Sequence, residues 1–161
     1  MSTARVIHFG SDGFQRVQAL QQVGLKVLAL QSLDRLRLHL ERNAEVDAVL
    51  VSEETSQGAE QAAALVRQRS AAPLILFRRS EAALDESRFD RIYASAVPPP
   101  FWLFDTAVLV EQCRTLRAQA KRLRKESEAV RRKSEWQRAR ARVQVKRNAT
   151  AKKPPEAGRW R

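Results

Sequence analysis

Cysteine and long apolar runs are scarce in this sequence, and each shortage excludes a class of protein. Cys113 is the only cysteine among 161 residues, so one chain can hold neither a disulfide framework nor a cysteine-based zinc site. No run approaches the roughly 18 apolar residues of a transmembrane helix. The first residues, "MSTARVIHFGSDG", lack the apolar core of a secretory signal. These absences predict a cytoplasmic protein.

Acidic residues are scarce towards the end of the chain. Up to Cys113 there are 12 Lys and Arg against 14 Asp and Glu, a balance of −2. From Arg114 onward the count is 18 against 4, a balance of +14, which accounts for the net charge of +12. A near-neutral body with a basic extension favours an acidic partner surface, nucleic acid or anionic lipid.

Short apolar runs alternate with helix-compatible stretches in the first two thirds of the chain. Five runs are predicted as strands: residues 5–9, 25–30, 47–51, 73–77 and 91–95. After the first run, the apolar face of a helix is predicted from Phe14, Val17, Leu20 and Val23. Helices are also predicted after the second and third runs, and in the short, polar interval 80–89.

Five near-continuous hydrophobic strands separated by helices predict a parallel sheet that is covered on both faces. Right-handed crossovers then give a doubly wound α/β domain, to which we assign residues 1–118. Binding sites of this architecture lie at the carboxyl ends of the strands. The candidates at these exits are Gly10, Ser11, Asp12, Ser52, Glu53, Glu54, Arg78, Arg79, and the residues from Ser95 onward.

The order and spacing of these segments resemble the receiver domain of two-component response regulators, a flavodoxin-like fold with strand order 2-1-3-4-5. The resemblance covers residues 4–118. In that family the phosphate-accepting aspartate ends the third strand, and "DAVLVS" puts Ser52 there. A magnesium-binding acidic pair follows the first strand, where this chain has Gly10 and Ser11, with Asp12 one position late.

The two remaining receiver positions are also changed. The switch Thr or Ser after the fourth strand is matched by Arg78, and the lysine after the fifth strand has no counterpart in "AVPPPF". The resemblance therefore implies a degenerate pseudo-receiver without the phosphorylation residues. Arg78 and Arg79 are expected either to neutralise the nearby carboxylates or to form surface pairs.

The acidic residues near the strand exits allow two interpretations. Asp12, Glu53 and Glu54 either gather and bind Mg²⁺ weakly, or are solvated and cap helices. No other cofactor and no dedicated metal site is predicted. An ordinary receiver whose acceptor is Glu53 or Asp47 is a further alternative, although Asp47 lies at the wrong end of its strand. His8 is predicted to be a partly buried, hydrogen-bonded histidine, the alternative being a ligand or a pH switch.

The stretch "PPPFWLF" (98–104) predicts a polyproline-like approach to the last helix. At least two of Phe101, Trp102 and Phe104 are expected to pack that helix on the sheet, the alternative being an exposed partner surface. The helix is expected to continue to about Lys146. A seven-residue repeat predicts a coiled-coil seam made of Leu109, Cys113, Leu116, Ala120, Leu123 and Val130. The seam predicts a homodimer, and a solitary solvated helix is the alternative.

The helical extension, 119–147, and the tail, 148–161, are strongly basic, and the tail is predicted to be disordered. Arg and Lys interspersed with tryptophan can neutralise phosphates and stack on bases, which predicts weak, non-specific nucleic-acid binding. The candidate contacts are Arg131, Arg132, Lys133, Arg138, Arg140, Arg142, Lys146 and Arg147.

The sequence contains no Walker or G-x-G-x-x-G pattern, and no catalytic residue is predicted. It predicts a non-enzymatic signal-transduction or regulatory protein of the response-regulator type. Such a protein would act independently of phosphorylation, through contacts with a signalling partner or a second copy. The main alternative is a nucleic-acid-associated protein that binds through its basic extension.

Overall fold

The computed structural model describes residues 3–42, 45–81 and 83–151, with the side chains at 147 and 149–151 outside the description. Its elements are β1 (Arg5–Phe9), α1 (Arg16–Gln22), β2 (Lys26–Leu30), α2 (Leu33–Arg42), β3 (Ala48–Ser52), α3 (Ser56–Arg69), β4 (Leu74–Arg78), η1 (Glu86–Arg88), β5 (Arg91–Ala94) and α4 (Pro99–Ala151). All five predicted strands are confirmed, each to within one residue at either end.

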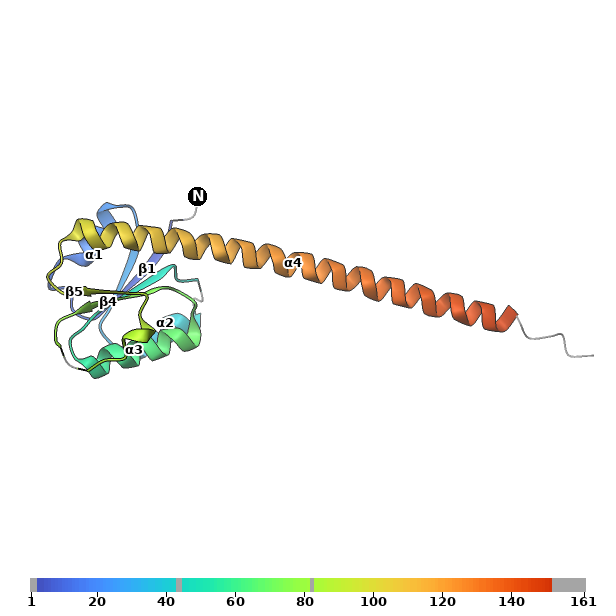
Figure 1. Ribbon diagram of the computed structural model, residues 1–161, viewed down its shortest axis with the longest axis horizontal. Helices are drawn as coiled ribbons and strands as arrows, with labels where there is room; N and C mark the ends of the chain where they lie inside the picture. The colour runs from blue at the N-terminus through green and yellow to red at the C-terminus, as the bar shows by residue number, and fades with distance from the viewer. Residues whose placement is uncertain (1–2, 43–44, 82, 152–161) are drawn as a thin grey trace, which may run out of the picture. The chain divides into compact units, whose positions relative to one another are not determined.

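The strands form one parallel sheet in the order β2-β1-β3-β4-β5, which confirms the predicted doubly wound, flavodoxin-like fold (Figure 1). Helices α2 and α3 cover one face of the sheet, and α1 and the first turns of α4 cover the other. Phe9 of β1 pairs with Val51 of β3, and Ser52 pairs with Phe77 of β4. The carboxyl ends of the three central strands therefore meet at one edge of the sheet.

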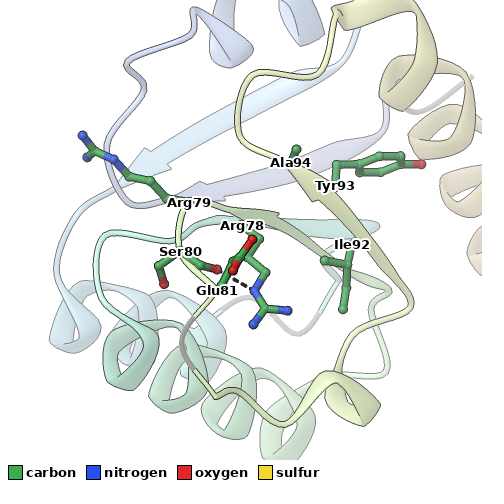
Figure 2. Close-up of a pocket in the computed structure, with 7 residues that line it drawn as sticks. All are labelled: Arg78, Arg79, Ser80, Glu81, Ile92, Tyr93 and Ala94. Atoms are coloured by element: carbon green, nitrogen blue, oxygen red, sulfur yellow. Dashed lines mark hydrogen bonds between the residues drawn. The ribbon is translucent and has the colours of Figure 1, made fainter.

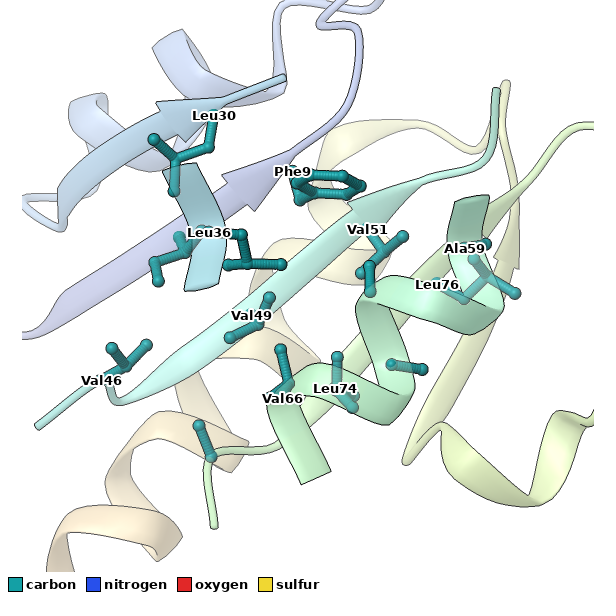
Figure 3. Close-up of a cluster of buried hydrophobic side chains, with 14 of the residues drawn as sticks. Phe9, Leu30, Leu36, Val46, Val49, Val51, Ala59, Val66, Leu74 and Leu76 are labelled. Carbon is teal, nitrogen blue, oxygen red and sulfur yellow. The ribbon is translucent and has the colours of Figure 1, made fainter. Parts of the chain in front are cut away.

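Apolar side chains of alternate strand residues fill the space on each face. Figure 3 shows the cluster beneath α2 and α3, where Val49 lies near Leu36 and Val66. A second cluster, which includes Leu50 and Trp102, fills the face under α1 and α4. The residues of β3 are all buried, which explains why this strand reads as a continuous apolar run.

Helix α1 differs from the predicted amphipathic helix. It has seven residues, of which Leu20 is the buried apolar one. Phe14 and Val23, two members of the predicted apolar face, expose 53% and 55% of their surface. The buried position one turn before Leu20 is occupied by Arg16. The predicted apolar face is therefore wrong, because a charged side chain takes part of the space beneath this helix.

The connection from β4 to β5 also differs from the prediction. Its only helix among the described residues is η1, a single 3-10 turn, so the α-helix predicted over 80–89 is not formed. Phe89 and Leu84 pack against the core in its place. The short interval therefore covers the β5 side of the sheet with a loop, and the four residues of β5 stay exposed or half-buried.

The start of α4 corrects two predictions. Pro99 and Pro100 form the first turn of the helix, where an N–H is not needed, so the predicted extended approach ends at Pro98. Of the three aromatic residues that follow, only Trp102 is buried, whereas Phe101 and Phe104 expose 67% and 70%. Residues three apart lie on one side of a helix, so Phe101 and Phe104 share the outer side. The expectation that at least two of the three pack on the sheet is wrong.

The chain divides into two compact units after Leu116. The second unit is described as the continuation of α4, a helix of about 50 Å from residue 117 to 151. The helix passes the predicted start of the tail at 148, and the rest of that tail, 152–161, lies outside the described residues. No described helix is long and apolar enough to cross a membrane.

The predicted seam divides in the same way. In the first unit, Leu109 is half-buried against the apolar cluster of the sheet, and Cys113 is buried. Leu116, Leu123 and Val130 expose 64%, 64% and 67% of their surface. Packing on the sheet therefore occupies the first two seam positions, and the exposed part of the seven-residue repeat begins at Leu116.

Candidate functional site

Ser52 ends β3 at the carboxyl edge of the sheet, at the position where the resemblance implies a phosphate acceptor. It is buried, with 8% of its surface exposed. Gly10, directly after β1, has a positive φ of 99° and lies against the Ser52 backbone. A Cβ atom at Gly10 would stand 2.6 Å from the Ser52 carbonyl oxygen. An acidic side chain at Gly10 would therefore require the backbone to move.

A buried arginine from α1 lies next to Ser52. Arg16 exposes 3% of its surface, and its Nη1 donates to Ser52 Oγ at 3.0 Å. Its Nη2 donates to the main-chain carbonyl of Ser95, directly beyond β5. Its guanidinium carbon lies 4.0 Å from the centre of the Phe77 ring in β4. One cation therefore connects the exits of β3, β4 and β5 through its forked donors and its flat face.

Arg16 was not predicted as a site residue, because an arginine among polar helix residues is ordinarily a surface residue. Two signals point to it in retrospect. It lies four residues after Asp12, and no lysine follows the fifth strand to supply a cation at this edge.

Asp12 organises the turn that leads into α1. Its Oδ1 accepts from the Arg16 amide at 2.6 Å, and its Oδ2 accepts from the Val17 amide at 3.2 Å. These are bonds of the helix-capping kind, so the capping interpretation holds for this residue. The neighbouring Ser11 is exposed and makes the exit of β1 polar without adding a carboxylate.

His8 is fully buried in β1, with its Nε2 3.0 Å from Ser52 Oγ. Because a guanidinium can only donate, Ser52 accepts from Arg16 and has its own hydroxyl proton available for His8. Among the described residues, His8 Nδ1 has no hydrogen-bond partner. Burial lowers the pKa of His8 to about 4; Asp12 opposes this shift and Arg16 reinforces it. The imidazole is therefore neutral at about pH 7.

We expect the buried imidazole to make the fold acid-sensitive. The pKa of His8 is about 4 in the folded chain, below its ordinary value of 6.5. Protonation thus favours the unfolded state, and stability that is complete above pH 6.5 is lost as the pH falls towards 4. The free energy of unfolding, measured with urea, should drop by about 2 kcal/mol between about pH 7 and about pH 5.

The chain contains two histidines, which supplies a matched control. His8→Gln should flatten the pH dependence between about pH 7 and about pH 5, a range above most carboxylate titrations. His39→Gln, at a half-buried position of α2 where burial and Arg5 also lower the pKa of the imidazole, should remove a smaller part of this dependence than His8→Gln. A slope that survives His8→Gln would show that another group titrates.

Glu53 is buried and bound to the loop that follows β4. Its Oε2 accepts from the amides of Arg79 at 2.7 Å and Ser80 at 3.1 Å. Its Oε1 accepts from the hydroxyls of Ser80 and Ser56. Burial raises the pKa of Glu53, but these hydrogen bonds outweigh burial and hold the pKa below its ordinary value. The carboxylate therefore fixes the β4 exit in its ionised form.

The carboxylates at this edge are thus used for structure. Asp12 and Glu53 each bind amide groups of a turn, and Glu54 is exposed. Within residues 3–42, 45–81 and 83–151, no three His, Cys, Asp or Glu side chains form a group that could hold a metal ion. Asp47, the other alternative acceptor, accepts from the Arg5 amide at the opposite end of the sheet.

Arg78 does not neutralise the carboxylates beside Ser52, contrary to one expectation. Its Nη1 pairs with Glu86, and its Nε donates to the Ser80 carbonyl at 2.7 Å. The side chain of Arg79 points away from Arg78 (Figure 2), and only its amide binds Glu53. An open groove of about 550 Å³ lies between this loop and β5, on the side where a crossover helix was predicted.

The predicted nucleic-acid contacts all lie in the helix of the second unit. The exposed ones are Arg131, Arg132, Lys133, Arg138, Arg140, Arg142 and Lys146. The guanidinium carbon of Arg140 lies 5.3 Å from the centre of the Trp136 ring. Trp136 exposes 61% of its surface, and the side chain of Arg147 lies outside the described residues.

Comparison with known proteins supports the fold alone. A fusion that carries amino acids 181–211 of the trimeric coiled coil of yeast Spc42 matches with a TM-score of 0.58 and 13% identity, over 81% of this chain and 95% of that one. The constitutive lysine decarboxylase of E. coli matches with a TM-score of 0.47 and 14% identity, over 69% of this chain and 18% of that one. With a TM-score this low, the match carries no argument. No family model matches the chain, and no curated protein matches its sequence.

Proposed function

We propose that this protein is a receiver-like regulatory protein that acts through protein–protein contacts and not through phosphorylation. The observation that carries the proposal is the buried guanidinium of Arg16, bonded to Ser52 Oγ and to the Ser95 carbonyl. In a receiver, according to the resemblance, a metal ion, a phosphoryl group and a lysine would act at these strand exits. Here the Arg16 side chain connects these exits through its own contacts.

The chemistry of phosphoryl transfer supports this proposal. An acceptor carboxylate, a hard cation with oxygen ligands and a second cation for the developing charge are needed. Ser52 offers a hydroxyl in place of a carboxylate, and Gly10 has no room for a metal-binding side chain. The Arg16 side chain also occupies the edge where a phosphoryl group would have to bind, so we infer that a binding partner regulates the protein in place of phosphate.

The proposal predicts that the protein stays unmodified when incubated with Mg²⁺ and acetyl phosphate. Intact-mass spectrometry should show no added phosphoryl group. Ser52→Asp should remain unmodified too, because the introduced carboxylate would pair with Arg16 and would still lack metal ligands at Gly10 and Ser11. A hydroxylamine-labile phosphate on the wild-type protein would return it to the active receivers. Phosphorylation of Ser52→Asp would show that the edge retains a working metal site.

Nucleic-acid association through the second unit is the second candidate function. Its support is the exposed Trp136 with Arg140 over the ring, in a helical segment that has 13 basic and 3 acidic residues between 117 and 151. An aromatic ring beside a guanidinium can stack on bases while the surrounding cations neutralise phosphates. Such binding would be weakly selective and strongly salt-dependent.

A further inference from the structure

One face of α4 in the second unit carries a short stripe of apolar and small residues. This stripe, which overlaps the end of the predicted coiled-coil seam, is called the seam below. It consists of Ala120, Leu123, Ser127, Val130 and Ser134, at alternating steps of three and four residues. Leu123 and Val130 expose 64% and 67% of their surface. This spacing is that of a helix that packs along a second helix.

The side chains of the seam are of unequal size. Leu123 and Val130 are large, whereas the three residues that alternate with them are alanine and serine. In a parallel pair of identical helices, each position of the seam faces its own copy. Ala120 would then face alanine and Ser127 would face serine, leaving thin layers with buried hydroxyl groups. A partner with large apolar residues at these layers would fill the space.

An antiparallel pair of two copies would match large side chains with small ones, but it would bring like charges together. It places the large residues of one helix against the small residues of the other. It also brings the same flank of both helices together, and one flank of this seam is Arg124, Arg131 and Arg138. These three arginines are exposed. Like charges at flanking positions disfavour pairing, so neither orientation suits a second copy.

The second flank of the seam and the net charge of this helix indicate which kind of partner would bind there. Gln119, Glu126 and Lys133 form the other flank, and Glu126 already accepts from Arg122 at 2.8 Å within the helix. From 117 to 151 the basic residues outnumber the acidic ones by 13 to 3. Acidic residues on a partner would therefore meet Arg124, Arg131 and Arg138 along one flank of the seam, which favours association and discriminates between partners.

We propose that the seam binds an amphipathic helix of another protein, with large apolar residues along its own seam and Glu or Asp at its flanking positions. This inference rests on the proposed function, for which it supplies the kind of partner. Size complementarity selects the apolar residues of that helix, and charge complementarity selects its flanks. A second copy and nucleic acid are the competing occupants of this surface.

The test uses the full chain and a labelled synthetic helix of four heptads, with Leu and Ile along its seam and Glu at its flanks. A matched peptide carries Lys at the same flanks. Fluorescence anisotropy should show at least about tenfold tighter binding of the Glu peptide. Leu123→Ala and Leu123→Asp should each weaken that binding, the aspartate by about tenfold or more. Arg131→Glu should weaken the binding of the Glu peptide and strengthen the binding of the Lys peptide.

Val143→Asp is the matched control, because Val143 exposes 54% of its surface on the other side of the helix from Leu123. It should leave peptide binding unchanged, and circular dichroism should show equal helix content in all variants. Equal binding of both peptides, or equal losses in Leu123→Asp and Val143→Asp, would overturn the proposal. It would also be overturned by a wild-type dimer, seen in light scattering, that Leu123→Asp dissociates.

Labelled duplex DNA is the last arm of the experiment. If DNA binds while the Glu peptide does not, the surface is a nucleic-acid site and the proposal fails. These outcomes are separate from the phosphodonor experiment, because anisotropy reports on the seam and intact mass reports on Ser52. If the Glu peptide does not bind, the proposal of phosphorylation-independent action still stands. If the protein accepts phosphate, that proposal fails, and peptide binding can still be measured separately.

Discussion

Replacing Trp102 with alanine is expected to lower the free energy of unfolding by about 3 to 5 kcal/mol. Trp102 exposes 1% of its surface and holds the start of α4 on the sheet. Its ring meets that of Phe77 edge to face, with ring centres 5.3 Å apart. The substitution removes this contact and leaves a cavity in the cluster that includes Leu50.

Phe104→Ala is the control for this prediction, because Phe104 lies in the same helical turn with 70% of its surface exposed. Its unfolding free energy should stay within about 0.5 kcal/mol of the wild type. Urea unfolding followed by far-ultraviolet circular dichroism measures both variants. If Trp102→Ala does not fold, Trp102→Phe should show a smaller loss of about 1 to 2 kcal/mol. Equal effects at positions 102 and 104 would contradict the packing described for α4.

The strands were predictable from sequence because the central strands are buried on both faces, whereas their order was implied by the resemblance to receiver domains. A continuous apolar run such as 47–51 is typical of a strand that is buried on both faces. Helices between successive strands indicate crossover connections and therefore a parallel sheet. The position of Ser52 at a strand exit followed from the same runs. The prediction of a partly buried His8 rested on its apolar neighbours in β1, and the structure buries the side chain completely.

The helices next to the site were less predictable, because their sequences are short and their partners are distant. The seven residues of α1 hold too few apolar positions to define a face, and Arg16 is stabilised in the interior by Phe77, Ser52 and Ser95, which are 36 to 79 positions away along the chain. The one local signal, Asp12 four residues earlier, does not by itself distinguish Arg16 from a surface arginine.

Glu53 shows the same limitation at the β4 exit. It reads as one of two adjacent acidic residues, and all but one of the groups that bind it, the Ser56 hydroxyl, come from residues 26 and 27 positions later. A carboxylate that accepts such bonds is a fixed part of the loop, whereas a solvated carboxylate is a candidate metal ligand. The sequence suggested either weak Mg²⁺ binding or a solvated, helix-capping carboxylate, and the bonds to Ser80 appear only in the fold.

Arg16→Ala is expected to lower the free energy of unfolding by about 3 kcal/mol. It removes the donors to Ser52 Oγ and the Ser95 carbonyl and the cover of the Phe77 ring. Arg16→Met keeps an apolar stem against that ring and should recover part of the loss, which separates packing from hydrogen bonding. Arg35→Ala, at an exposed position of α2, should change the free energy by less than about 0.5 kcal/mol.

A second measurement distinguishes the effect of the Arg16 charge from the effect of its packing. Because the Arg16 charge contributes to lowering the pKa of His8, its removal should raise that pKa, which an NMR titration of the imidazole would detect in both Arg16→Ala and Arg16→Met. Neither variant should gain phosphorylation, since Gly10 and Ser11 still supply no metal ligand. If Arg16→Ala keeps its full stability, the core alone holds the strand exits together. The observation that carries the phosphorylation-independent function would then be lost.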